Sequence, residues 1–161
     1  MATERMIRVI VVEDHALLRE GLQTFLESFG DVKIVGEAVS GEEALEKVER
    51  ILPDVVVMDI NIHHMDGITA TRKIHGRYPT IPIVGLTVLS RKSSFQPMLD
   101  AGAFRVLTKG ETAVEGLYEA IKEAVTPVSV RPEDESGILI NKPRDVRTSI
   151  PEDHTIKEPS T

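Results

Sequence analysis

The run Val55-Val56-Val57-Met58-Asp59 decides the fold, because four successive apolar residues end at an aspartate. An uninterrupted apolar run is typical of a strand that is buried on both faces of a parallel sheet. The rest of the chain alternates strand-like and helix-like patterns, which predicts helices on both faces of that sheet. A carboxylate that ends a buried strand then lies at the carboxyl edge of the sheet, where doubly wound α/β proteins place their sites.

Five apolar runs are predicted as strands. They are residues 7–12, 32–38, 55–59, 81–87 and 103–108. The second run is mixed in polarity, which favours a place near an edge of the sheet, whereas residues 55–59 are apolar enough for a central strand.

Apolar residues at helical spacing predict the elements between these strands. Ser40 with Glu43 forms a capping-box pattern at the start of one helix, and Asp66-Gly67 precedes another. Pro97 fits only the first turn of a helix, so the segment 90–102 predicts a short helix that starts near residue 94. Residues 112–125 give the clearest amphipathic pattern. The residues predicted to face inward are Leu18, Leu22, Phe25, Leu26, Phe29, Ala44, Leu45, Val48, Ile51, Ile68, Thr71, Ile74, Val114, Leu117, Tyr118, Ile121 and Val125.

Composition narrows the class of protein. The chain has 161 residues, 41% hydrophobic content, no cysteine and a net charge of −7. Cysteine-based disulfide and metal sites are therefore excluded, and a general nucleic-acid-binding surface is disfavoured. No stretch reaches the ~20 apolar residues of a membrane span, and the first residues lack the apolar core of a signal peptide, which favours a cytoplasmic protein.

The chain divides into two regions. Residues 5–125 hold all the predicted strands and helices, whereas residues 126–161 contain prolines among Glu, Asp, Ser and Thr and show no sustained periodicity. Such a segment buries too little apolar surface to offset its ordering entropy, so we expect a mostly disordered tail.

Polar residues of different kinds follow the other apolar runs. Glu13-Asp14 follow the first, Thr87 ends the fourth and Lys109 follows the fifth. If the runs are parallel strands, these side chains meet Asp59 at one edge. Carboxylates neutralised by a divalent cation and an ammonium suit the capture of a phosphoryl group.

These motifs, in this order, resemble the receiver domain of two-component response regulators. The run Val12-Glu13-Asp14-His15, followed by Leu17-Leu18-Arg19, is similar to receivers of the NarL/FixJ type. The resemblance implies a flavodoxin-like (βα)5 fold with a five-stranded parallel sheet in the order 2-1-3-4-5. It also implies Mg²⁺-dependent phosphorylation of one aspartate by a histidine kinase.

The resemblance also assigns roles residue by residue. Asp59 matches the phospho-acceptor, Thr87 the switch hydroxyl and Lys109 the lysine of the family. The Mg²⁺ ligands would be Glu13, Asp14, Asp59 and the backbone carbonyl of Asn61.

Partners follow from the same resemblance. They would be a sensor histidine kinase or a phosphotransfer protein, and a homodimer is allowed. NarL/FixJ-type chains continue into a helix-turn-helix domain, for which residues 126–161 are too few and lack helical periodicity. We therefore expect a switch protein without an enzymatic output domain and without direct contact to nucleic acid or membrane.

Three positions depart from the family pattern, all on the face that reports phosphorylation. His63 stands where proline is common, Val106 where the switch aromatic is usual, and Val88 where a small residue follows the hydroxyl. His63-His64 also suggests a metal site, but adjacent histidines in a loop rarely converge on one ion, so surface or packing roles are favoured.

Two other functions stay open. A phosphohydrolase of the haloacid-dehalogenase kind also uses a strand-end aspartate and Mg²⁺, but it needs a second aspartate at the position of Asn61. A phosphorylation-independent interaction domain is compatible with Val88 and Val106.

Overall fold

The sheet has the predicted topology. The computed structural model describes residues 5–88, 93–110 and 114–127. In these ranges five parallel strands lie in the order β2-β1-β3-β4-β5, with β3 at the centre and β2 at an edge. The elements are β1 (Ile7–Val12), α1 (Ala16–Glu27), β2 (Val32–Ala38), α2 (Gly41–Ile51), β3 (Val55–Asp59), α3 (Gly67–Arg77), β4 (Ile83–Val88), α4 (Phe95–Asp100), β5 (Arg105–Lys109) and α5 (Val114–Val125).

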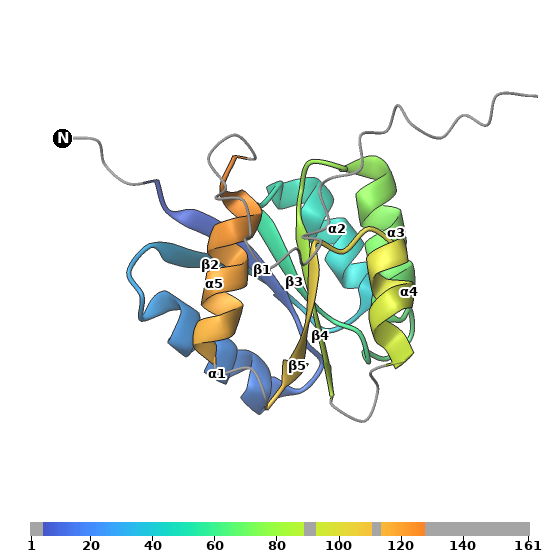
Figure 1. Cartoon of the computed structure of the whole chain (residues 1–161), viewed down its shortest axis with the longest axis horizontal. Helices are drawn as coiled ribbons and strands as arrows, with labels where there is room; N and C mark the ends of the chain where they lie inside the picture. Colours follow the sequence, from blue (N-terminus) through green and yellow to red (C-terminus); the bar gives the residue numbers. More distant parts are fainter. Residues whose placement is uncertain (1–4, 89–92, 111–113, 128–161) are drawn as a thin grey trace, which may run out of the picture.

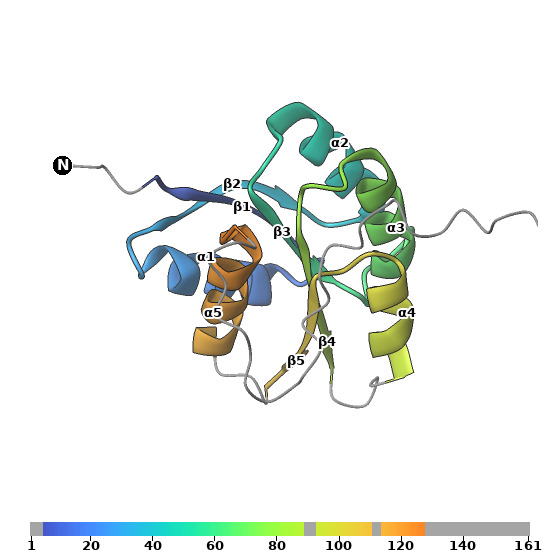
Figure 2. The same ribbon diagram turned by 45° about the horizontal axis from the view of Figure 1, so that its top comes forward.

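Two apolar layers cover the sheet, because successive strand residues point to opposite faces. On one face α1 and α5 pack over Val9 and Val57, and on the other α2, α3 and α4 pack over Ile10 and Met58. Figures 1 and 2 show α1 and α5 on one side and the other three helices on the opposite side. This confirms the doubly wound α/β fold and explains why β3 is apolar throughout.

Both boundaries of two strands differ from the prediction, since β4 and β5 begin two residues later and end one residue later, at Val88 and Lys109. β4 begins at Ile83 rather than at residue 81, because Pro82 has no N–H for the ladder, although its carbonyl oxygen accepts from Val56 at 3.0 Å. β5 begins at Arg105 rather than at residue 103, because the Ala103 N–H donates to Met98 O at the end of α4.

The helix caps follow the sequence signals. The Ser40 side chain accepts from the Glu43 N–H at the start of α2, and Asp66 accepts from the Thr69 N–H at the start of α3. α4 is short, with Ser94 at its N-cap and Pro97 in its first turn, as predicted. Residues 111–113, where the last helix was predicted to start, lie outside the described residues.

Two residues predicted to face inward on α1 are only partly covered. Leu18 is 37% exposed, and Phe29, beyond the end of the helix, is 36% exposed. The Phe29 ring instead stacks on Tyr118 of α5, with ring centroids 3.8 Å apart. The buried face of α1 is therefore narrower than the apolar pattern of its sequence predicts. Its buried residues are Leu22 and Leu26.

No helix in the described ranges is both long and apolar enough to cross a membrane. The tail predicted for residues 126–161 lies outside the described residues from position 128 onward.

Candidate functional site

Three strands bring oppositely charged side chains together at the carboxyl edge of the sheet. Glu13 follows β1, Asp59 ends β3 and Lys109 ends β5. Lys109 Nζ donates to Glu13 Oε2 at 2.8 Å and lies 3.1 Å from Asp59 Oδ2. Glu13 and Asp59 are only 1% and 2% exposed. One ammonium group thus faces two buried carboxylates.

Asp14 completes an acidic cluster with these two residues. Glu13, Asp14 and Asp59 each offer a carboxylate oxygen, and the three oxygens lie within 4.8 Å of one another. Oxygen ligands at this spacing suit a hard divalent cation such as Mg²⁺. These residues therefore fit the metal that the fold family implies, and such a cluster is typical of receiver-domain Mg²⁺ sites.

The pKa of Glu13 is raised above its ordinary value, so its charged form is disfavoured at this edge. Burial raises this pKa, and the nearby charge of Asp59 raises it further. The hydrogen bond and charge of Lys109 act in the opposite direction but do not offset them. Because the charged form of Glu13 is disfavoured, an additional cation would stabilise it.

Lys109 stays charged in spite of its partial burial. Burial alone would lower the pKa of its ammonium group, but the hydrogen bond to Glu13 and the charge of Asp59 raise it above its ordinary value. The lysine therefore provides a fixed positive charge beside the Asp59 carboxylate.

Asp14 is paired with His63, a residue of the β3–α3 loop. His63 Nδ1 hydrogen-bonds Asp14 Oδ2. Burial would raise the pKa of Asp14, but the hydrogen bond and charge of His63 lower it. Asp14 does not cap α1, since the N-cap residue is His15, which makes no side-chain cap bond.

Asn61 links the Asp59 carboxylate to the Thr87 hydroxyl. The Asn61 N–H donates to Asp59 Oδ1 at 3.0 Å, and its side-chain amide donates to Thr87 Oγ1 at 3.5 Å. Thr87 Oγ1 in turn donates to Val88 O at 3.5 Å. The structure thus brings all six predicted site residues to one edge, while their roles stay predictions.

Glycines fix the start of the loop that carries Asn61 and His63. A Cβ on Gly67 would lie 2.3 Å from Asp59 O, and one on Gly41 would lie 2.7 Å from Met65 O. A side chain at either position would collide with backbone. The β3–α3 loop is therefore held closely between the N-termini of α2 and α3.

Val106 and Val88, two of the positions that depart from the family pattern, differ in burial. Val106 is half-buried and packs on the layer formed by α2, α3 and α4. Its Cγ2 atom lies 3.5 Å from the position of a Cβ on Gly85, where Met98 of α4 also approaches. Val88 is 39% exposed. The side chain at position 106 thus belongs to the apolar layer under α4.

The sequence alone indicates no role for Arg19, although this residue lies in the Leu17-Leu18-Arg19 run that resembles the family. Arg19 Nη1 donates to Glu13 O at 2.9 Å, and its Nε lies 3.3 Å from Glu37 Oε1. The side chain therefore ties α1 to the loop after β1. The Leu17-Leu18-Arg19 run draws attention to Arg19 in the sequence, but only the fold shows that its side chain contacts the backbone carbonyl of Glu13.

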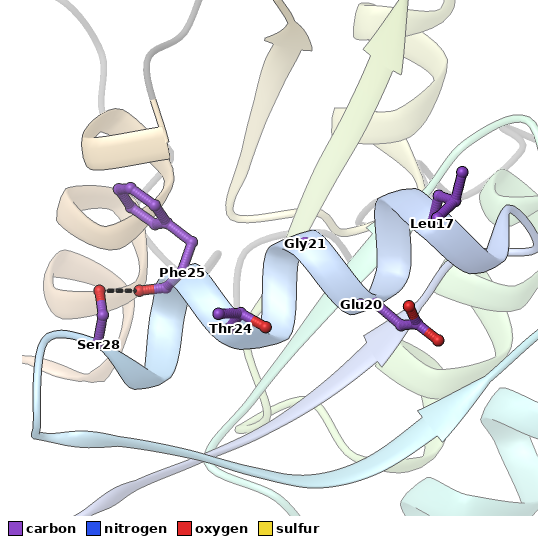
Figure 3. Close-up of a pocket in the computed structure, with 6 residues that line it drawn as sticks. All are labelled: Leu17, Glu20, Gly21, Thr24, Phe25 and Ser28. Atoms are coloured by element: carbon purple, nitrogen blue, oxygen red, sulfur yellow. Dashed lines mark hydrogen bonds between the residues drawn. The ribbon is translucent and has the colours of Figure 1, made fainter.

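Two hollows lie near this edge. A cavity of about 100 Å³ beside Lys109 is lined mainly by leucines of α1, β4, β5 and α5. A surface hollow of about 520 Å³ runs along α1, lined by Leu17, Glu20, Gly21, Thr24, Phe25 and Ser28. Figure 3 shows a local hydrogen bond there, in which Ser28 Oγ donates to Phe25 O at 2.5 Å. The α1 hollow contains none of the proposed site residues.

The sheet order and the acidic edge define a doubly wound α/β protein of the receiver class. Residues 9–122 match the family model described as the response regulator receiver domain. The chain belongs to this family of two-component signalling proteins. Its relatives include NarL/LuxR-type regulators, as the sequence motifs suggested.

Curated relatives support this assignment. The chain is 40% identical over 117 residues to response regulator GacA of Pseudomonas viridiflava, covering 73% of this chain and 54% of that protein. It is 37% identical over 119 residues to the transcriptional regulatory protein LiaR of Bacillus subtilis, covering 74% and 56%. The chain thus spans about half the length of the curated relatives it matches.

Solved structures show the same fold. A two-component response regulator of the LuxR family from Aurantimonas superposes with a TM-score of 0.70 at 29% identity, covering 74% of this chain and 85% of that one. The response regulator domain of Thermotoga maritima CheB gives 0.68 at 32% identity, covering 80% and 100%.

Proposed function

We propose that this chain is a phosphorylation-controlled switch in which Asp59 accepts a phosphoryl group from a histidine kinase or a phosphotransfer protein. The observation that carries the proposal is the pairing of the buried Asp59 carboxylate with Lys109 Nζ at 3.1 Å, inside the acidic cluster. A carboxylate can approach an anionic phosphoryl group only where charge is neutralised.

The proposed transfer uses the charges beside Asp59. An Asp59 carboxylate oxygen attacks the phosphorus of a phosphohistidine, an O–P bond forms, the P–N bond breaks and the donor imidazole leaves. Lys109 holds positive charge beside the carboxylate, and the Asn61 N–H orients its Oδ1 atom. A bound Mg²⁺, held by Glu13, Asp14, Asp59 and the Asn61 carbonyl, would neutralise charge on the phosphoryl oxygens.

The product is an acyl phosphate, and its hydrolysis resets the switch. The Thr87 hydroxyl accepts from the Asn61 side-chain amide at 3.5 Å, and after transfer it would exchange its bond to Val88 O for one to a phosphoryl oxygen. Such a bond would convert a local charge change into a change in residues 87–94, of which residues 89–92 lie outside the described residues. Because Val106 is short and β-branched, we expect this segment rather than residue 106 to report phosphorylation.

The two alternative functions depend on different residues. A haloacid-dehalogenase-type phosphohydrolase needs a second acid or base, whereas Asn61 offers an amide that bonds Thr87. A phosphorylation-independent interaction domain is favoured by Val106, which lacks the ring of a switch aromatic.

One experiment separates the three functions. The chain is incubated with Mg²⁺ and acetyl phosphate or phosphoramidate, and its intact mass is measured. We expect one phosphoryl group per chain, lost completely in Asp59→Asn and kept in Asp100→Asn, a carboxylate on α4 outside the cluster. Continuous turnover would indicate a phosphohydrolase, and absence of label in the wild type would indicate the interaction domain. Phosphate on another residue at wild-type yield would overturn the assignment of Asp59.

A further inference from the structure

His63 reaches the acidic cluster from the β3–α3 loop. Its imidazole Nδ1 hydrogen-bonds Asp14 Oδ2, while the side chain as a whole is 84% exposed. Asp14 is 19% exposed, so the pair lies at the outer rim of the cluster, above the buried Glu13 and Asp59. An imidazole nitrogen thus contacts one of the three carboxylates that fit a divalent cation.

The distance between a hydrogen-bonded nitrogen and oxygen matches that of two ligands on one ion. In an octahedral site with bonds of about 2.1 Å, adjacent ligand atoms lie roughly 3 Å apart. A hydrogen-bonded pair has a similar separation. One cation bound by both atoms would lie beside the line that joins them, and the exposed His63 ring would turn to point its nitrogen at the ion.

Carboxylate oxygens and imidazole nitrogens favour different cations, so the contact between His63 and Asp14 bears on which metal the site prefers. Mg²⁺ favours oxygen ligands, whereas imidazole suits Co²⁺, Ni²⁺ and Zn²⁺, which bind nitrogen more tightly. We propose that His63 is a specificity-determining residue of the metal site, which adds an imidazole ligand and shifts the preference of the site from Mg²⁺ toward first-row transition cations. This inference rests on the proposed function, because it needs the acidic cluster to hold a cation.

The neighbouring histidines provide the contrast. His64 adopts a left-handed backbone conformation with φ of 64°, and its side chain makes no hydrogen bond within the described parts of the chain. His15 contributes its backbone N–H, which donates to Glu13 Oε1 at 3.2 Å. Of the three, only His63 places a ring nitrogen against a carboxylate of the cluster.

The test compares two cations on matched variants. Affinities for Mg²⁺ and Co²⁺ are measured by titration calorimetry on wild type, His63→Ala and His64→Asn, since asparagine tolerates a positive φ. We expect His63→Ala to weaken Co²⁺ binding at least about tenfold while Mg²⁺ binding changes less than about twofold. His64→Asn should match the wild type for both cations. Pulsed electron paramagnetic resonance of the Mn²⁺-loaded wild type should show coupling to an imidazole nitrogen that is absent from His63→Ala.

Two failures are distinguishable. If the wild type binds both cations but His63→Ala leaves the ratio of their affinities unchanged, or if nitrogen coupling is absent, the role of His63 is overturned and the proposed function stands. If the wild type binds neither cation, the proposed metal site itself fails, and the inference fails with it.

Discussion

Two carboxylate–lysine clusters lie at opposite edges of the sheet, and they differ in charge balance. At the carboxyl edge, Lys109 serves two buried carboxylates, Glu13 and Asp59. The pKa of Glu13 is raised, first by its burial and then by the charge of Asp59. The folded state therefore disfavours the charged form of Glu13.

At the amino edge one carboxylate has two donors. Asp31, just before β2, accepts hydrogen bonds at Oδ2 from Tyr118 Oη and Lys122 Nζ, each at 2.7 Å. Burial would raise the pKa of Asp31, but these bonds outweigh it and lower the pKa. Lys122 also lies 5.8 Å from the centroid of the Tyr118 ring, on which Phe29 stacks. Asp31 Oδ2 is thus matched by two donors, whereas the buried Oδ1 has no hydrogen-bond partner within the described residues, and the cluster ties the α1–β2 connection to α5.

The comparison separates a structural ion pair from a candidate site. Glu13 and Asp31 have opposite pKa directions, because burial outweighs the hydrogen bonds that Glu13 accepts, whereas the hydrogen bonds that Asp31 accepts outweigh its burial. A cluster that leaves buried negative charge unmatched has a use for a cation, whereas a matched one contributes to stability alone. The following experiments test this difference.

The largest expected effect concerns metal binding at the carboxyl edge. Asp14→Ala should weaken Mg²⁺ binding roughly 30–100-fold, or about 2–3 kcal/mol, because the site loses one of few protein oxygens. Lys109→Ala should leave Mg²⁺ affinity intact or improve it, since it removes a nearby positive charge. Asp31→Ala serves as the control and should bind Mg²⁺ as the wild type does. Unchanged affinity in Asp14→Ala, measured by calorimetry, would contradict the idea of an unmatched edge.

The next effect concerns stability at the amino edge. Asp31→Ala should cost about 1–2 kcal/mol, because it removes two hydrogen bonds to one carboxylate. The pKa of Asp31 is lowered in the folded state, so its contribution is present above its ordinary value of 3.8 and is lost as pH falls through the folded value. Urea denaturation at pH 7 should therefore show the full cost, and the cost should shrink in acid. An equal cost at both pH values would show that packing, rather than charge, holds this edge.

Glu13→Gln should have a smaller effect of the opposite sign. The pKa of Glu13 is raised in the folded state, so its contribution is present below its ordinary value of 4.5 and is lost as pH rises through the folded value. Without divalent cations, the variant should be more stable than the wild type at pH 8 by roughly 1 kcal/mol, or about 2–4 °C in Tm. This gain should vanish near pH 4. Mg²⁺ should stabilise the wild type more than the variant, and a variant less stable at pH 8 would show that Lys109 already balances the edge.

The carboxyl edge could be predicted because its residues obey a local rule. Asp59, Glu13 and Lys109 each end or follow an apolar run, and parallel strands bring such positions together. The whole sheet followed from the same alternation of strand and helix patterns. Errors arose where a neighbour in space decides the outcome, as at Phe29, whose cover is the ring of Tyr118.

Two contacts that the sequence does not indicate join residues far apart in the chain. Asp14 and His63 are 49 residues apart, and Asp31 and Lys122 are 91 apart. No periodicity links such positions, because loop conformation and the packing of α5 on α1 bring them together. Arg19 likewise gained a partner only when α1 was placed beside the loop after β1.

The smallest expected effect tests whether the balanced amino edge stands by itself. α5 ends near this edge, where Thr126 Oγ1 donates to Lys122 O at 2.6 Å. Both apolar layers are complete within the described residues, so removing residues 128–161 should change the free energy of unfolding by less than about 1 kcal/mol. Thermal unfolding of the full chain and of the shortened chain measures this directly.

A fall in Tm of more than a few degrees would show that the apolar residues 138–140 pack on the domain. Combining the truncation with Asp31→Ala would then show whether they pack at the amino edge. Non-additive losses would place them there, because mutations at contacting sites do not sum.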